Sequence, residues 1–251
     1  MPGLAVVDGS GRQHVLVLHG WALDSGIWST SRPLTDMEQF TYAYFDFPGY
    51  GTQRSSPPAA GLDDMAAQAL AAAGELGWDR FAVLGHSMGG ATAMRVATLA
   101  PDRVTAVVAL TPVAPTGMSL PEEAYRSFEA AWADPAPALA GLAPHLTAQQ
   151  LHDIVSRCQA SMDQSTWDAY LANWTSADFA GVVSTYEAPT TLAYGVSDPL
   201  VTADYLADTV AGLRDGQLVP IEGAGHYPMV ERPEETVRLW EEALRKGAAR
   251  A

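Results

Sequence analysis

The stretch Phe81-Ala82-Val83-Leu84-Gly85-His86-Ser87-Met88-Gly89-Gly90 decides the fold, because it joins an apolar run to the helix-forming run Met88–Ala100. An apolar run without alternation is typical of a parallel strand that is buried on both faces. A serine within G-x-S-x-G at such a junction lies on a tight strand-to-helix turn, where the flanking glycines avoid side-chain collisions. The sequence therefore predicts that Ser87 is a nucleophile held out above the end of a strand.

Strands and helices are predicted to alternate along most of the chain. The other apolar runs bounded by turn residues are His14–Leu18, Thr41–Phe45, Val104–Leu110, Thr190–Tyr194 and Gln217–Ile221. The helix-forming stretches are Leu62–Leu76, Met88–Ala100, Thr202–Gly212 and Pro233–Lys246. Alternation of this kind implies right-handed crossovers, so we expect an α/β protein with a doubly wound, mostly parallel sheet. About thirteen residues precede His14, so we expect a shortened N-terminus with little room for extra strands.

The alternation is interrupted from about Pro115 to Ala188. This segment offers no convincing strand, and its helical pieces are predicted around Pro121–Trp132, Thr147–Ala160 and Asp163–Trp174. A helical block between two strands of one sheet is typical of a lid. We therefore expect a core formed by residues 1–114 and 189–251, and an inserted all-helical lid formed by residues 115–188.

His226 is the predicted base for Ser87, because a serine hydroxyl is a poor nucleophile until a neighbouring group takes its proton. It lies in a glycine-rich loop, Glu222-Gly223-Ala224-Gly225-His226-Tyr227-Pro228, between the last predicted strand and the last helix. That position is at the C-terminal edge of the sheet, on the same side as Ser87. The remaining histidines lie at the ends of a strand, inside the Ser87 turn or in the helical segment: His14, His19, His86, His145 and His152.

Asp198 is the predicted acid that holds the imidazole in the right tautomer. It follows the strand Thr190–Tyr194 in Gly195-Val196-Ser197-Asp198-Pro199-Leu200, again at the C-terminal edge of the sheet. The preceding strand ends in Ala109-Leu110-Thr111-Pro112 and offers no acid. The order along the chain is therefore Ser, Asp, His, which is one of the orders in which such triads occur.

Two backbone amides are predicted to bind the negative oxygen that forms when a serine attacks a carbonyl. Met88 begins the helix after Ser87, and Trp21 follows the first clear strand in His19-Gly20-Trp21. Glycine at position 20 lets the backbone approach the nucleophile, so both N–H groups can form an oxyanion hole. His19 and Asp46 are interpreted as residues that hold their loops in place, without a chemical role.

These motifs resemble the landmarks of the α/β-hydrolase family: His19-Gly20-Trp21, Asp46-x-Pro48-Gly49-x-Gly51, Gly85-x-Ser87-x-Gly89, Gly195-x-x-Asp198 and Gly225-His226. The likeness covers nearly the whole chain except the lid, and it is greatest to small carboxylesterases related to the pimeloyl carrier-protein methyl ester esterase. Enol-lactone hydrolases are similar too. The resemblance implies an ester, thioester or lactone substrate, a cap that roofs the pocket, and no cofactor. Thr52-Gln53-Arg54 departs from the family pattern, in which a serine and an acidic residue are more usual.

Aromatic and methionine side chains of the lid are expected to line a substrate pocket beneath it. Two residues next to the oxyanion and histidine loops are expected to join them. The candidate pocket residues are Trp28, Met118, Tyr125, Phe128, Trp132, Trp167, Tyr170 and Tyr227. Such a lining favours an uncharged, hydrophobic ester.

The composition excludes several classes of partner. The formal net charge is -15, so nucleic acid and anionic membranes are not expected to bind. The single cysteine, Cys158, cannot form an internal disulfide, and no residue spacing predicts a metal site. We expect a cytoplasmic monomer or homodimer that acts on a small-molecule ester, because neither a signal peptide nor an apolar run of about 18 residues is present.

The predicted reaction is ester hydrolysis through an acyl-enzyme. The same three residues also serve thioesterases, enol-lactonases, C–C bond hydrolases and cofactor-free perhydrolases, and these alternatives stay open. Epoxide and haloalkane chemistry is disfavoured, because those relatives have an aspartate where Ser87 stands. A ligand-binding protein without catalysis is a further alternative, although none of the three residues is missing.

Overall fold

A computed structural model describes residues 3–249. These residues form a seven-stranded sheet in the order β1-β3-β2-β4-β5-β6-β7. The strands are β1 (Leu4–Gly9), β2 (Gln13–Leu18), β3 (Phe40–Phe45), β4 (Phe81–His86), β5 (Val104–Leu110), β6 (Thr190–Gly195) and β7 (Gly216–Ile221). β1 is antiparallel to β3 and the other neighbours are parallel, which confirms the predicted doubly wound, mostly parallel sheet.

β1 is a strand that the apolar pattern does not predict. Its six residues are half-buried or exposed, so they lack the continuous apolar run of the central strands. A strand at the edge of a sheet packs one face only, and a short segment suffices to pair with one neighbour. The residues before His14 were expected to leave little room for a further strand, but they do form one, β1.

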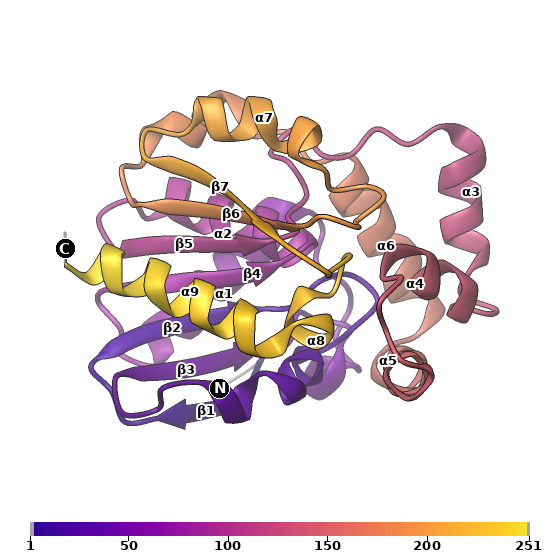
Figure 1. The fold of residues 1–251 in the computed structure, drawn as a ribbon, viewed down its shortest axis with the longest axis horizontal. Helices are drawn as coiled ribbons and strands as arrows, with labels where there is room; N and C mark the ends of the chain where they lie inside the picture. The colour runs from indigo at the N-terminus through magenta and orange to yellow at the C-terminus, as the bar shows by residue number, and fades with distance from the viewer. Residues whose placement is uncertain (1–2, 250–251) are drawn as a thin grey trace.

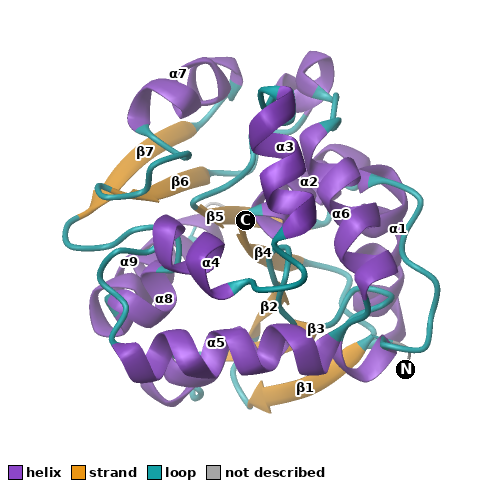
Figure 2. Cartoon of the chain, turned by 90° about the vertical axis from the view of Figure 1, so that its right-hand side faces the viewer, coloured by secondary structure: helices purple, strands orange, loops and turns teal. Residues whose placement is uncertain are grey.

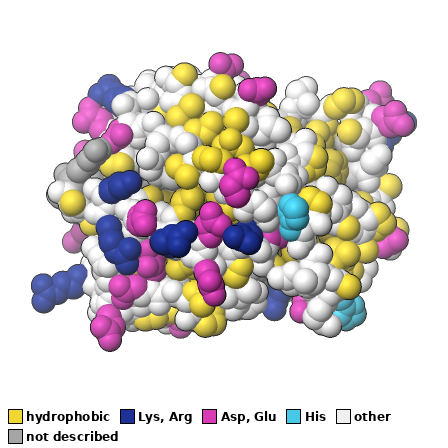
Figure 3. All heavy atoms as spheres, viewed as in Figure 1, with side chains coloured by type: hydrophobic (Ala, Val, Ile, Leu, Met, Phe, Trp, Pro, Cys, Tyr) yellow, Lys and Arg dark blue, Asp and Glu magenta, His cyan; other side chains and the backbone are white. Residues whose placement is uncertain are grey.

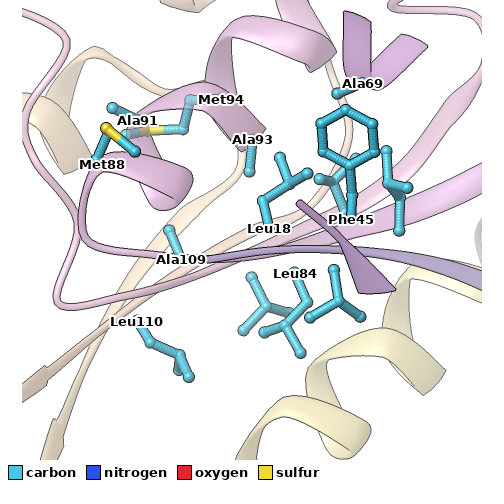
Figure 4. Packing of buried hydrophobic residues seen from close by; sticks show 14 of the residues in the cluster. Leu18, Phe45, Ala69, Leu84, Met88, Ala91, Ala93, Met94, Ala109 and Leu110 are labelled. Carbon is cyan, nitrogen blue, oxygen red and sulfur yellow. The ribbon is translucent and has the colours of Figure 1, made fainter. Parts of the chain in front are cut away.

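Helices cover both faces of the sheet. In Figure 1, α9 (Pro233–Ala248) crosses the front, whereas α1 (Leu62–Glu75) and α2 (Met88–Leu99) lie behind. α7 (Ala203–Gly212) packs against β7, and the short α8 (Pro228–Glu231) leads into α9. Figure 4 shows buried side chains on both sides of the strands, with Leu18 on one side and Leu84 on the other. The 3₁₀ helices η1 (Ser25–Thr30), η2 (Arg32–Leu34) and η3 (Gly51–Gln53) lie in the loops after β2 and β3.

A helical segment connects β5 to β6. It contains α3 (Glu122–Ala130), α4 (Ala136–Leu142), α5 (Ala148–Ser161), α6 (Gln164–Thr175) and the 3₁₀ helix η4 (Ala180–Thr185). We call residues 115–188 the helical insertion. Figure 1 shows α3–α6 together at one end of the sheet, and Figure 2 shows them in front of the strand ends.

α4 is a helix that the sequence pattern does not predict, because prolines crowd its start. Pro135 caps α4 and Pro137 lies in its first turn, where the missing N–H has no intrahelical acceptor in any case. α5 begins with a capping box, in which the Thr147 hydroxyl accepts from the Gln150 N–H while the Gln150 side chain accepts from the Thr147 N–H. The α4–α5 corner is the turn at residues 143–147, between the end of α4 and the capped start of α5.

The surface carries both signs of charge despite the net negative balance. On the face that Figure 3 shows, acidic and basic side chains lie close together, and a hydrophobic area lies above them. None of the helices in residues 3–249 is long and apolar enough to cross a membrane.

Candidate active site

Ser87 occupies a strained turn between β4 and α2. Its backbone angles are φ 53° and ψ −117°, in a region that residues other than glycine rarely adopt. A Cβ at Gly85 would lie 2.1 Å from the Gly89 carbonyl oxygen, and one at Gly89 would lie 2.4 Å from the His19 carbonyl oxygen. Both glycines are therefore required for the chain to pass through this turn and leave the Ser87 hydroxyl at the end of the sheet.

The structure brings Ser87, His226 and Asp198 together. The His226 Nδ1 lies 2.7 Å from the Asp198 Oδ2, and its Nε2 lies 3.0 Å from the Ser87 Oγ. These distances fit an imidazole that donates from Nδ1 to the carboxylate and accepts the hydroxyl proton at Nε2. All three residues are buried and follow three different strands, β4, β6 and β7. The hydrogen-bonded chain therefore depends on the sheet that places the strand ends side by side.

The Asp198 carboxylate is held in its ionised form. Burial by itself raises the pKa of this carboxyl group, but the neighbouring His226 and two amide hydrogen bonds outweigh burial and leave the pKa below its ordinary value. The amides are those of Leu200 and Val201, which donate to the Asp198 Oδ1 over 2.9 and 3.0 Å. One oxygen is thus fixed by the backbone, while the other faces the imidazole.

His19 and Asp46 support the neighbouring loops. The His19 Nδ1 donates to the Gly20 carbonyl, and its Nε2 accepts from the Phe47 N–H. Asp46 accepts hydrogen bonds from the Ser25 N–H and from both the N–H and the hydroxyl of Thr52. Burial lowers the pKa of the His19 imidazole, so the ring stays neutral at pH 7. Both residues have the geometry expected of loop supports.

The amides of Trp21 and Met88 lie next to the Ser87 turn. Met88 is the first residue of α2, so its N–H has no acceptor within the helix. The backbone hydrogen bonds between described residues also leave the Trp21 N–H without an acceptor. The Trp21 side chain is fixed separately, because its Nε1 donates to the Trp167 carbonyl of α6 over 2.9 Å. Among the described residues, neither N–H group therefore has a backbone acceptor.

A small apolar cavity opens beside Ser87 and His226. The space open to the centre of a water molecule is about 30 Å³. Besides those two residues it is lined by Trp21, Val113, Met118, Phe128, Leu142, Trp174, Leu200, Val201 and Tyr227. Apart from the histidine, no residue in this lining is ionisable near neutral pH. The cavity suits a short, uncharged group.

Three of the predicted pocket residues line the cavity, namely Met118, Phe128 and Tyr227. The other five predicted residues do not line this cavity, because their side chains pack elsewhere. Trp28 packs edge-on against Trp240 of α9, with ring centroids 5.8 Å apart.

The four predicted aromatic residues of the insertion that do not line the cavity pack against other parts of the protein. Trp167 packs against the Trp21 ring with centroids 4.0 Å apart, and Tyr170 donates its hydroxyl proton to the Pro48 carbonyl over 2.8 Å. Tyr125 and Trp132 are half-buried and pack against the hydrophobic core. Helical spacing identifies an apolar face, but it does not distinguish residues that line a cavity from residues that support them.

The sequence reasoning missed several lining residues. Leu200 and Val201 come two and three residues after Asp198, and Val113 comes three residues after β5, so their closeness to a strand end was a signal that could have found them. Leu142 has no such signal, because it ends α4 and approaches the site only through the folding of the insertion. Arg54 does not line the cavity, since it pairs with Asp163 over 2.6 Å.

Neither the single cysteine nor a metal site adds a reactive group to the described part of the chain. Burial raises the pKa of the Cys158 thiol to about 12, so the thiolate is rare at neutral pH. Within residues 3–249, no cluster of three histidine, cysteine or acidic side chains is arranged to hold a metal ion.

Comparison with known proteins identifies the family. The sequence model of the alpha/beta hydrolase family matches residues 15–239. A pimeloyl-[acyl-carrier protein] methyl ester esterase of Cronobacter sakazakii is 28% identical over 243 residues, covering 90% of this chain and 91% of that protein. The chain belongs to the alpha/beta hydrolase family and is a hydrolase enzyme, and the predicted likeness to that esterase is confirmed.

Solved structures share the fold along nearly the whole chain. An esterase of Exiguobacterium antarcticum superposes with a TM-score of 0.86 at 16% identity, covering 96% of this chain and 94% of that one. The enol-lactonase of Burkholderia xenovorans LB400 superposes with a TM-score of 0.83 at 18% identity, covering 96% and 95%. At these identities the likeness establishes the fold alone.

Proposed function

We propose that this protein hydrolyses small, uncharged carboxylic esters, with Ser87 as nucleophile, His226 as base and Asp198 as the acid that orients His226. The observation that carries the proposal is the continuous hydrogen-bonded chain from Asp198 to His226 to Ser87. That chain ends at a strained serine beside an apolar cavity. Esterases among the sequence relatives support the same reaction class.

The proposed reaction has two halves. The Ser87 hydroxyl attacks the ester carbonyl while His226 Nε2 takes its proton, and the amides of Trp21 and Met88 bind the oxyanion. His226 then gives the proton to the departing alcohol, which leaves an acyl group on Ser87. A water molecule activated by His226 hydrolyses this acyl-enzyme and restores the serine.

The size and lining of the cavity limit the substrate. About 30 Å³ is room for roughly two water-sized groups, since one such group needs about 10–15 Å³. Bulky side chains of the insertion, Phe128 and Trp174, close part of this space. We therefore propose a short acyl group, and we propose that the helical insertion acts as the lid that selects it.

The decisive test compares Ser87→Ala with wild-type protein on an activated ester such as p-nitrophenyl acetate. We expect kcat to fall by about 10⁴–10⁶-fold, because the nucleophile is removed. Exposed Ser184, in η4, provides the control, since Ser184→Ala leaves the site intact. A fluorophosphonate probe should label the wild-type protein at Ser87 and leave the variant unlabelled. Wild-type rates in the Ser87→Ala variant, or labelling elsewhere, would refute the assignment.

An ester panel separates the alternative substrates. Acyl and alcohol lengths are varied independently, and matched thioesters and enol lactones are included. We expect the highest kcat/KM for short acyl oxygen esters. A preference for thioesters or lactones of the same acyl length would keep the three catalytic residues and change the substrate class.

A further inference from the structure

Glu231 binds the backbone on both sides of His226. It is the last residue of α8, and its Oε2 accepts hydrogen bonds from the N–H groups of Gly225 and Tyr227, each over 3.0 Å. We propose that Glu231 is a positioning residue that holds the histidine loop, together with the corner between α4 and α5, so that His226 stays between Asp198 and Ser87. The proposal rests on the catalytic role proposed for His226.

The backbone N–H and carbonyl of His226 itself also form hydrogen bonds. Its N–H donates to the Leu142 carbonyl at the end of α4 over 2.9 Å. Its carbonyl accepts from the His86 Nε2 over 2.8 Å and from the Thr111 hydroxyl over 3.0 Å. Since burial holds the pKa of His86 well below its ordinary value, this ring stays neutral and keeps one N–H to donate. The insertion thus contacts the backbone of His226 directly.

The second oxygen of Glu231 reaches the insertion. Its Oε1 accepts from the His145 N–H over 3.2 Å, in the turn between α4 and α5. The Gln150 side chain donates to the Val230 carbonyl over 3.0 Å and ties the start of α5 to α8. A single carboxyl group therefore joins the histidine loop to this corner of the insertion. The corner supports His226 besides contributing Leu142 to the cavity wall.

The sequence of the loop explains why it needs such a support. Gly223 has φ +67°, and a Cβ at Gly225 would lie 2.7 Å from the Leu142 carbonyl oxygen. Glycines allow this close approach, but they also leave the free loop many conformations. Without Glu231, two buried N–H groups would lose their acceptor and the loop could shift. A displacement of about 1 Å at a catalytic group is enough to cost roughly 100-fold in rate.

The experiment compares Glu231→Ala, Glu231→Gln and the control Glu235→Gln in the full chain. Glu235 is a neighbouring carboxylate that pairs with Arg232 in α9 and does not touch the histidine loop. We expect Glu231→Ala to lower kcat by about 10–100-fold with KM changed less than about threefold. Glu231→Gln should fall between Glu231→Ala and wild type. Its amide oxygen still accepts from the loop, but its NH₂ group then faces the His145 N–H. The control should keep the wild-type kcat.

A second readout does not depend on activity. The proton on His226 Nδ1 that bridges to Asp198 gives a low-field NMR resonance when the pair is held together. We expect this resonance to broaden or disappear in Glu231→Ala and to persist in Glu235→Gln. The Gln variant and this resonance decide the matter if the Ala variant does not fold.

The outcomes separate the two proposals. Folded Glu231 variants with wild-type kcat and an unchanged resonance would overturn the positioning role. An equal loss of kcat in Glu235→Gln would also overturn it, because the effect would then be one of general charge. If the wild-type protein hydrolyses no ester, or Ser87→Ala keeps full activity, the proposed function fails. The resonance still tests whether Glu231 holds the pair.

Discussion

The loops at the end of the sheet and the helical insertion contribute to the candidate site in different ways. Ser87, Asp198 and His226 each follow a strand, and the parallel register of β4–β7 brings those ends together. Phe128 and Trp174 come from helices of the insertion and reach the cavity through side-chain packing. Backbone hydrogen bonds between strands fix the first group closely. Apolar contacts, which are less directional, fix the second.

The contrast implies a division of work. In the proposed function, the loops at the strand ends supply the chemistry, and the insertion supplies part of the cavity wall that selects the substrate. The two meet at the α4–α5 corner, where His226 donates to Leu142 and Glu231 accepts from His145. Changes in the loops should therefore lower the rate for every ester, whereas changes in the cavity wall should alter the preference among esters.

After Ser87→Ala, the largest effect is expected from Asp198→Asn. The amide can present an N–H to His226, which favours the wrong tautomer and leaves no acceptor at Nε2 for the Ser87 proton. We expect kcat to fall by roughly 10⁴-fold for all esters, as for other triads. Steady-state kinetics on a short and a medium acyl ester measure this. Unequal losses for the two esters would contradict the proposal that the strand-end loops affect the rate for all esters equally.

Acid is expected to lower the thermal stability of the fold. Burial lowers the pKa values of His19 and His86 from the ordinary 6.5, so the unfolded chain binds these protons first. The free energy of unfolding therefore does not depend on these two histidines above about pH 6.5, and it decreases as the pH falls below that value. Tm measured by calorimetry should therefore decrease between pH 7 and pH 5. A constant Tm over this range would mean that these two rings are not held neutral.

Phe128→Ala should alter selectivity with little effect on the chemistry. Removing the ring enlarges the cavity, so the ratio of kcat/KM for a six-carbon over a two-carbon acyl ester should rise roughly tenfold. Tyr125→Ala is the matched control, since Tyr125 lies on the same helix and does not line the cavity. If both variants shift the ratio equally, the effect comes from a general loss of packing around α3. The Phe128 ring would then not be what limits the acyl length.

The smallest effect is expected at Cys158 in α5. Its thiol is fully buried and its pKa is raised to about 12, so alkylating reagents at pH 8 should leave the folded protein unmodified and active. Mass spectrometry measures the modification, and unfolding in denaturant should expose the thiol. Rapid alkylation of the native protein would show that α5 opens away from the core.

The strand ends explain why so much of the site could be predicted. Gly85 and Gly89 mark a turn that side chains would block, and Gly225 marks the close approach beside His226. Local sequence is informative there, because the backbone geometry demands particular residues. The cavity wall offers no comparable rule: Trp28 of η1 and Tyr170 of the insertion are both aromatic, but packing turns them toward Trp240 and Pro48.

The sequence by itself determined the parallel sheet and the three residues at its edge. Apolar runs and glycine turns are local consequences of strand burial and backbone sterics. Only the tertiary structure decided which side chains close the cavity, that Leu142 accepts from His226, and that Glu231 joins the loop to the insertion. The contacts between α8 and the α4–α5 corner join residues 80 to 86 positions apart, and the cavity wall depends on the packing of several helices. No short pattern in the chain specifies such contacts.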